Sequence, residues 1–113
     1  KLERPIIIRA DSEGRHLWTQ DEVVVPDAQH SSYRHGAIDT DSAGNTYVVG
    51  IGATTRYPIQ AIPYLIQTTQ QGFIAKLDPD GNRLWFREIP PSSTINAVAV
   101  LADGTIATAG SAQ

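Results

Sequence analysis

The sequence predicts an all-β protein made of short hairpins, and three observations support this fold class. Runs rich in Ile, Val, Tyr, Trp and Phe alternate with clusters of Asp, Ser, Asn and Gly, a pattern typical of strands joined by tight turns. No segment of useful length has the 3.6-residue periodicity of an amphipathic helix. Four of the polar clusters contain a glycine, which supplies the positive φ that tight hairpin turns require: Gly14, Gly44, Gly81 and Gly104.

Two hairpin patterns occur twice in the chain, in the same order. The segment IIIRADSEGRHLW (residues 6–18) matches FIAKLDPDGNRLW (residues 73–85). Behind it, AIDTDSAGNTYVVG (residues 37–50) matches AVAVLADGTIATAG (residues 97–110). The repeat unit is therefore two hairpins long, about 60 residues. Paired hairpins at this period favour a β-propeller, in which each blade is a four-stranded antiparallel sheet, over a β-sandwich.

These repeated segments resemble the SBBP repeats, the seven-bladed β-propeller type repeats of many bacterial surface and secreted proteins. The resemblance is strongest in YPIQAIPYLIQTTQQGFIAKLDPDGNRLW (residues 57–85) and continues in INAVAVLADGTIATAG (residues 95–110). Two features depart from the family's pattern. Leu101 and Ala102 stand where an aspartate usually follows the innermost strand, and residues 21–36 form an enlarged loop. The resemblance implies a secreted or cell-surface bacterial protein.

The resemblance also implies an order of strands, with A innermost and D outermost in each blade. The chain then runs C-D, A-B-C-D, A-B, as a single two-blade unit over residues 1–113. Residues 1–35 hold a half-blade and a loop, residues 36–90 one complete blade, and residues 91–113 a second half-blade. The expected strands are A at residues 37–40 and 97–101, B at 46–50 and 105–110, C at 6–10 and 73–78, and D at 15–20 and 83–89.

Each half-blade would leave a strand edge with unpaired backbone groups. Two arrangements would pair both edges: further blades in a longer polypeptide, or several copies joined head to tail, each leading hairpin completing a neighbour's trailing hairpin. With two blades per chain, such a ring closes with three copies or with four. We expect one of these arrangements rather than a self-contained small β-domain.

The composition argues against several kinds of partner and chemistry. The formal charge of −3 at pH 7, without a Lys/Arg run, disfavours nucleic acid and anionic membrane surfaces as partners. No apolar stretch approaches the roughly 20 residues that span a bilayer, so we expect no membrane insertion. The absence of cysteine excludes disulfides, thiolate metal sites and cysteine nucleophiles.

The long connections are the expected binding regions, because strand alternation places residues 21–35, 51–72 and 90–96 on one face of the disc, opposite the tight turns. The segment QHSSYRHG offers histidine, tyrosine and arginine groups for sugars or carboxylates, and a tryptophan can stack on a sugar ring. The competing interpretations are a solvated insertion for this segment and a repeated packing role for the two tryptophans. No cofactor is expected. The candidate ligand-binding residues are His30, Tyr33, Arg34, His35, Arg56, Tyr57 and Trp85.

Metal and hydrolytic sites are disfavoured in the same segment. His30 and His35 do not have the spacing of a common zinc site, and no acidic third ligand lies in the same run. Ser31 or Ser32 with His35 and Asp39 supplies the residue types of a hydrolytic triad. Nothing nearby resembles a nucleophile elbow or an oxyanion hole, however. We therefore expect neither a metal nor a catalytic residue here.

Two groups of oxygen-bearing side chains have the alternating look of calcium loops, but both lack the terminal glutamate of an EF-hand. Turn chemistry explains them better, because Asp and Asn side chains bond to backbone amides two residues further on. The groups are Asp39, Asp41 and Asn45, and Asp78, Asp80 and Asn82.

The leading functional hypothesis is a noncatalytic binding or scaffolding module that presents long loops to a protein or a glycan, as a lectin would. One alternative is a fragment of a propeller enzyme, a hydrolase or lyase with its site at the ring axis. The A strands offer mostly Ala, Val, Ile and Leu there, and Asp39 is the exception. A second alternative is a structural unit whose only activity is ring formation. Fold alone does not decide among them.

Overall fold

The structure is a computed structural model and describes residues 6–20, 32–56, 67–89 and 93–112. These residues form antiparallel strands and turns, and no helix occurs among them, as the sequence predicts. No helix long and apolar enough to cross a membrane occurs in the described part of the chain. The strands are β1 (Ile7–Ala10), β2 (His16–Gln20), β3 (Ser32–Thr40), β4 (Thr46–Arg56), β5 (Gln67–Leu77), β6 (Arg83–Ile89), β7 (Ser93–Val100) and β8 (Ile106–Ala112).

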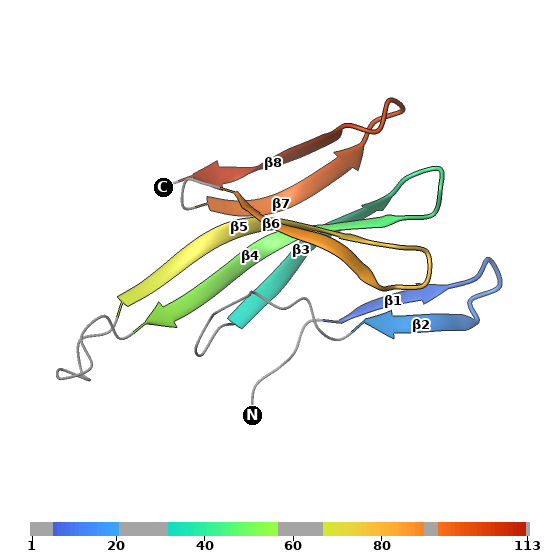
Figure 1. The fold of residues 1–113 in the computed structure, drawn as a ribbon, viewed down its shortest axis with the longest axis horizontal. Helices are drawn as coiled ribbons and strands as arrows, with labels where there is room; N and C mark the ends of the chain where they lie inside the picture. The colour runs from blue at the N-terminus through green and yellow to red at the C-terminus, as the bar shows by residue number, and fades with distance from the viewer. Residues whose placement is uncertain (1–5, 21–31, 57–66, 90–92, 113) are drawn as a thin grey trace.

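The strands are arranged as three sheets. A four-stranded sheet with the order β3-β4-β5-β6 lies in the middle, and the hairpins β1-β2 and β7-β8 each form a two-stranded sheet. The two hairpins lie on opposite sides of the middle sheet (Figure 1). The all-β class, the four hairpins and the pairing of β3 to β6 into one sheet are therefore confirmed.

The four hairpin turns lie at one end of the molecule (Figure 1). Their glycines have φ between 84° and 90°, which confirms the predicted turn geometry. The turn that carries Leu101 in place of an aspartate keeps the same backbone bonds. Leu101 N donates to Thr105 O at 2.8 Å, and Gly104 N donates to Leu101 O at 2.9 Å. The departure from the repeat therefore removes a carboxylate and leaves the course of the backbone unchanged.

Several strands are longer than the sequence predicts, so the expected loop boundaries are wrong. Residues 51–56 and 67–72 were expected in a connection, but β4 and β5 pair as far as Arg56 and Gln67. Residues 32–35 belong to β3 and residues 93–96 to β7. Bulges at residues 35–37 and 95–97 let pairing continue past the repeated segment. Opposite these bulges stand Gly50 and Gly110, where a Cβ would collide with the carbonyl oxygens of Arg34 and Thr94.

The middle sheet is apolar on both faces. Val48 and Val49 are neighbours in β4, point to opposite faces, and have only 1% and 0% of their surface exposed. On the first face, Ile7 of β1 packs in one cluster with Val48, Phe73, Ala75 and Leu77. On the second face, β7 lies against β3, β4 and β5. Each flanking hairpin thus covers part of one apolar face of the middle sheet.

The flanking hairpins stack on the corresponding hairpins of the middle sheet. Trp18 of β2 donates its ring N–H to the carbonyl oxygen of Pro79, in the β5-β6 turn, at 2.8 Å. Gln20 donates to the carbonyl oxygen of Gly81 in the same turn at 3.0 Å. On the other face, the backbone N–H of Val100 in β7 donates to Asp39 Oδ2 of β3 at 2.8 Å. The β1-β2 hairpin therefore lies on β5-β6, its equivalent in the repeat, and the β7-β8 hairpin lies on its equivalent, β3-β4.

Gly81→Ala should destabilise the protein more than Gly14→Ala. Both positions have positive φ, so either alanine costs about 1–2 kcal/mol in backbone strain. A Cβ at Gly81 would also lie 2.7 Å from Cδ2 of Trp18, which adds about 1–3 kcal/mol of overpacking, whereas nothing lies within 4 Å of a Cβ at Gly14. Urea unfolding of dilute protein measures the difference. Equal losses in the two variants would show that Trp18 does not rest on this turn.

Candidate functional site

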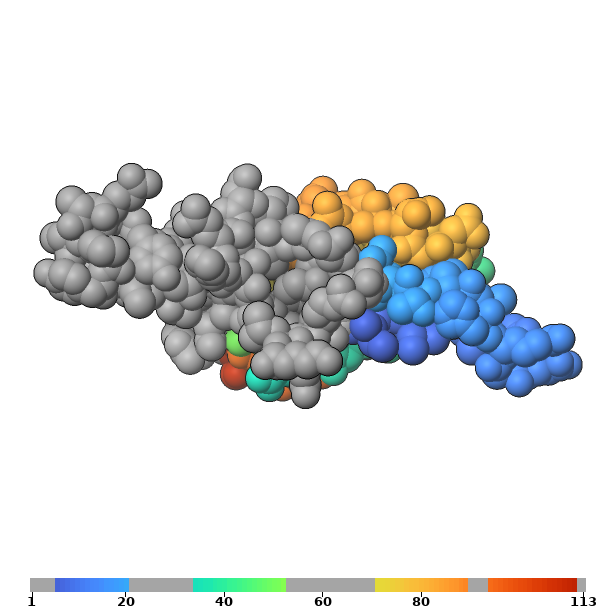
Figure 2. Space-filling model, turned by 90° about the horizontal axis from the view of Figure 1, so that it is seen from below, coloured from blue at the N-terminus to red at the C-terminus, as the bar shows by residue number. Residues whose placement is uncertain are grey.

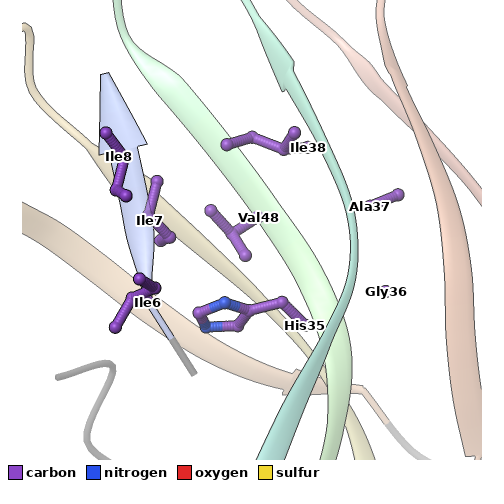
Figure 3. A pocket seen from close by; sticks show the side chains of 8 residues that line it. All are labelled: Ile6, Ile7, Ile8, His35, Gly36, Ala37, Ile38 and Val48. Atoms are coloured by element: carbon purple, nitrogen blue, oxygen red, sulfur yellow. The ribbon is translucent and has the colours of Figure 1, made fainter. Parts of the chain in front are cut away.

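Among the described residues, a groove lies beside the edge of β1 that does not pair with β2. Two contiguous hollows of about 340 and 260 Å³ form it, and Ile7, Ile8 and Ile38 line both. Figure 3 shows its first part, where Ile38, Val48 and His35 point toward β1. The remaining lining residues are Ile6, Gly36 and Ala37 in the first part, and Arg9, Trp18, Asp39, Thr40 and Thr46 in the second.

The groove is mostly apolar, and three of the four isoleucines that line it are uncovered. Ile6, Ile8 and Ile38 have 52%, 56% and 54% of their surface exposed. Contiguous exposed apolar side chains beside an open strand edge are typical of a surface that binds another protein segment. The lining is unsuited to a charged small molecule.

His35 lies at one end of the groove, in β3 and not in a loop. Its ring is half-buried and stands edge-on to Phe73, with the ring centroids 6.2 Å apart. Burial lowers the pKa of His35 below its ordinary 6.5. The imidazole is therefore neutral at neutral pH and acts in packing.

Asp39 and Arg9 lie toward the other end of the groove, and both are engaged by backbone groups. The Arg9 guanidinium donates to the carbonyl oxygen of Gly44. Asp39 accepts from the backbone N–H of Thr40 through Oδ1 and from that of Val100 through Oδ2, both at 2.8 Å. These bonds, that from Val100 above all, hold the pKa of Asp39 below its ordinary 3.8. The carboxylate thus joins two sheets and has the wrong environment for a general base.

Asp41 and Asp78, one aspartate from each group with a calcium-like spacing, bond to their own turns, whereas Asp39 does not. Asp41 Oδ1 accepts from the backbone N–H groups of Ala43 and Asn45, and Oδ2 accepts from the Asn45 amide and the Tyr47 hydroxyl. These bonds, led by that from the Asn45 side chain, lower the pKa of Asp41 to about 2. Asp78 Oδ1 accepts from the backbone N–H groups of Asp80 and Asn82 in the same way. Among the described residues, no three His, Asp or Glu side chains gather as a metal site would require.

The predicted ligand-binding residues do not form one site where the structure describes them. Arg34 is exposed in β3, and His35 lies in the groove. Trp85 lies on the opposite face of the middle sheet, edge-on to Tyr47 at 6.4 Å, with the Arg87 guanidinium 5.4 Å above its ring. His30 and Tyr57 lie outside the described residues. Tyr33 and Arg56 are strand residues of β3 and β4 whose side chains are not described.

The expected packing role of the tryptophans is seen for Trp18, which covers the turn of the adjacent sheet. Sequence reasoning missed the isoleucine groove. The available signal was the run Ile6, Ile7 and Ile8, because a strand with one solvent-exposed face alternates apolar and polar residues, and this one does not. No family model, curated protein or solved structure matches the chain.

The amide of Val100 should lose its protection from hydrogen exchange in acid. The pKa of Asp39 is lowered in the folded protein, so the stabilisation from its carboxylate is complete above pH 3.8 and is lost as the pH falls through the folded-state value. Asp39→Asn keeps an acceptor oxygen but does not titrate, so its Val100 exchange should show no such acid step. An identical acid step in both proteins would contradict this role of Asp39.

Proposed function

We propose that the chain is a two-blade unit of a β-propeller and works as a noncatalytic scaffold that presents its long connections to a protein or glycan. The observation that carries the proposal is the stacking of equivalent hairpins on both faces of the middle sheet. Trp18 rests on the β5-β6 turn, and β7 is bonded to β3 through Asp39. Radial stacking of blades in a propeller requires this like-on-like contact at each interface.

The tight turns at one end leave the other end as the ligand-facing side. Residues that precede Gly36 in β3 and follow Gly50 in β4 extend the middle sheet toward that end. Tyr33 pairs there with Gly52, and Arg56 pairs with Gln67. Three of the candidate ligand-binding residues, Tyr33, Arg34 and Arg56, therefore stand on regular strands on this side. A rigid sheet holds such positions more firmly than a loop does.

The enzyme alternative is disfavoured by the state of Asp39, the one carboxylate on the inner strands β3 and β7. A general base at the axis must be free to take a proton from a substrate. The Asp39 carboxylate is bonded to two backbone amides, which stabilise its charged form and hold it between β3 and β7. It is therefore a structural group in this proposal.

Electron micrographs of the native particle should show a closed disc with a central hole. Two blades per chain give a disc of three copies or of four. The disc would be averaged from particles at low protein concentration, so that crowding does not create contacts. An open filament or a compact particle without a hole would contradict the propeller.

Tyr33→Ala should weaken retention on an immobilised glycan bound by the wild-type protein, by about tenfold, because an aromatic ring contributes roughly 1–3 kcal/mol when a partner buries it. Ser42→Ala, in a tight turn at the opposite end, is the matched control and should leave retention unchanged. No binding across a broad glycan array would contradict the glycan branch of the proposal.

A further inference from the structure

The free edges of β1 and β8 correspond to edges that are paired in the middle sheet. By sequence repeat, β1 is the equivalent of β5, and β8 is the equivalent of β4. In the middle sheet β4 and β5 pair with each other along their whole length. In the flanking hairpins, β1 pairs only with β2 and β8 only with β7. By this equivalence, the edge of β1 should pair with a strand like β8, and the edge of β8 should pair with a strand like β1.

The two edges cannot meet within one described molecule, because their hairpins cover opposite faces of the middle sheet. Figure 1 shows β1 and β8 on different sides of β3-β4-β5-β6. The strand that pairs with the free edge of β1 is therefore neither β8 of the same molecule nor any other of its described strands. It must also lie over β3 and β4, where the groove leaves Ile8 and Ile38 exposed.

The β7-β8 hairpin has the right chemistry for this groove. In this chain, β7 already packs on the second face of β3 and β4, and a bulge shapes it like β3 itself. Ile95 is already buried within its own chain, and the face of the hairpin that remains exposed carries small apolar residues on both strands: Ala97, Ala99, Ala107 and Ala109. An apolar hairpin with one free edge would fill an apolar groove that has one free edge.

From these observations we infer that the groove along β1 seats the β7-β8 hairpin of a second copy of this chain, with β8 of that copy hydrogen-bonded to β1. The inference rests on the proposed propeller unit and deepens it by naming the partner, the surface and the strand register.

The repeat sets the register of this junction. In the middle sheet, Thr46 pairs with Leu77, Val48 with Ala75, and Gly50 with Phe73. The equivalent residues on β8 are Ile106, Thr108 and Gly110, and those on β1 are Ala10, Ile8 and Ile6. Thr108 of the second copy therefore lies opposite Ile8, and Gly110 lies opposite Ile6. A slip by one residue would turn every side chain of β8 to the wrong face.

The same junction explains residues that no described strand of the single chain covers. Trp85 and Arg87 occupy on β6 the positions that Trp18 and Gln20 occupy on β2. Trp18 covers Gly81, whereas nothing lies within 4 Å of a Cβ at the equivalent Gly14. Figure 2 shows the tip of the β1-β2 hairpin standing clear of the other described strands. In the assembly, Trp85 of one copy covers Gly14 of the next, so Trp85 packs against protein and not against a sugar.

A cross-linking experiment tests the register directly, because the chain contains no cysteine. Ile8→Cys protein is mixed with Thr108→Cys protein that carries a larger tag, and the mixture is mildly oxidised. Directly opposed residues have Cβ atoms about 4.5–5.5 Å apart, close to disulfide range, so a covalent heterodimer should form. The matched control pairs Ile8→Cys with Ala109→Cys, the next residue on β8, whose side chain points to the other face.

A heterodimer that forms with Thr108→Cys and not with Ala109→Cys supports the junction. Equal yields from the two pairs, or no heterodimer from either, would overturn it; the latter is the result expected if blades of a longer polypeptide fill the groove. The result is independent of particle shape. Discs without this cross-link would contradict the junction but agree with the propeller. Filaments that form the cross-link would agree with the junction but contradict the propeller.

A second measurement does not depend on disulfide geometry. Gly14→Ala and Gly104→Ala carry the same backbone strain, since φ is 84° and 89°, and neither Cβ meets an atom within 4 Å in the single chain. In the assembly, a Cβ at Gly14 would press on Trp85 of the next copy as one at Gly81 would press on Trp18. Gly104 corresponds to Gly44, whose nearest atoms leave room at 3.5 Å. Gly14→Ala should therefore weaken self-association by about tenfold or more relative to Gly104→Ala. Equal association constants for the two variants would overturn the proposal.

Discussion

The structure depends on a middle sheet that is apolar on both of its faces. Adjacent residues of a strand point to opposite sides, so the burial of both Val48 and Val49 requires a layer above and a layer below. The chain supplies these layers as two hairpins: β1-β2 precedes the strands of the middle sheet in the sequence, and β7-β8 follows them. A layer two strands wide cannot cover a sheet four strands wide. The first face is therefore open over β3, where the isoleucine groove lies, and the second face is open over β6, where Trp85 lies.

The tight turns set how the layers stack as well as how each hairpin closes. A glycine with positive φ is required for the turn itself. Because it has no side chain, the same glycine leaves a flat patch of backbone on which a tryptophan from the next layer can rest, as Trp18 rests on Gly81. The carbonyl oxygens of Pro79 and Gly81 then accept the N–H groups of Trp18 and Gln20. One local feature thereby determines both the fold of a hairpin and its alignment with a neighbour.

Sequence reasoning was sufficient for features encoded locally or by repetition, and insufficient for features set by packing. The turns and pairing of all four hairpins follow from glycine-containing clusters such as those at Gly44 and Gly81, and from the repeated segments. The extension of β4 to Arg56 does not, because residues 51–56 carry no repeat and their strand state comes from pairing with β5. The place of His35 in the groove depends on β1 lying across the groove from β3, which no local pattern states. The sequence predicts turn bonds for both Asp39 and Asp41. Asp41 makes them. Asp39 instead accepts a hydrogen bond from Val100 on the distant strand β7.

The repeat is imperfect at one position, and this difference makes the junctions of the proposed assembly unequal. Asp39 joins β3 to β7 within the chain, but the equivalent residue of β7 is Ala99, which has no carboxylate to offer Thr40 of the next copy. The outer hairpins differ in this respect. Trp18 within the chain and Trp85 between chains are the same residue, so both would make the same contact. Every interface between blades would then consist of one half within a chain and one half between chains. The inner half between chains lacks the charge-assisted hydrogen bond and is the weaker one. Dissociation would therefore begin at β7 on the isoleucine groove, while the tryptophans still hold the outer hairpins together.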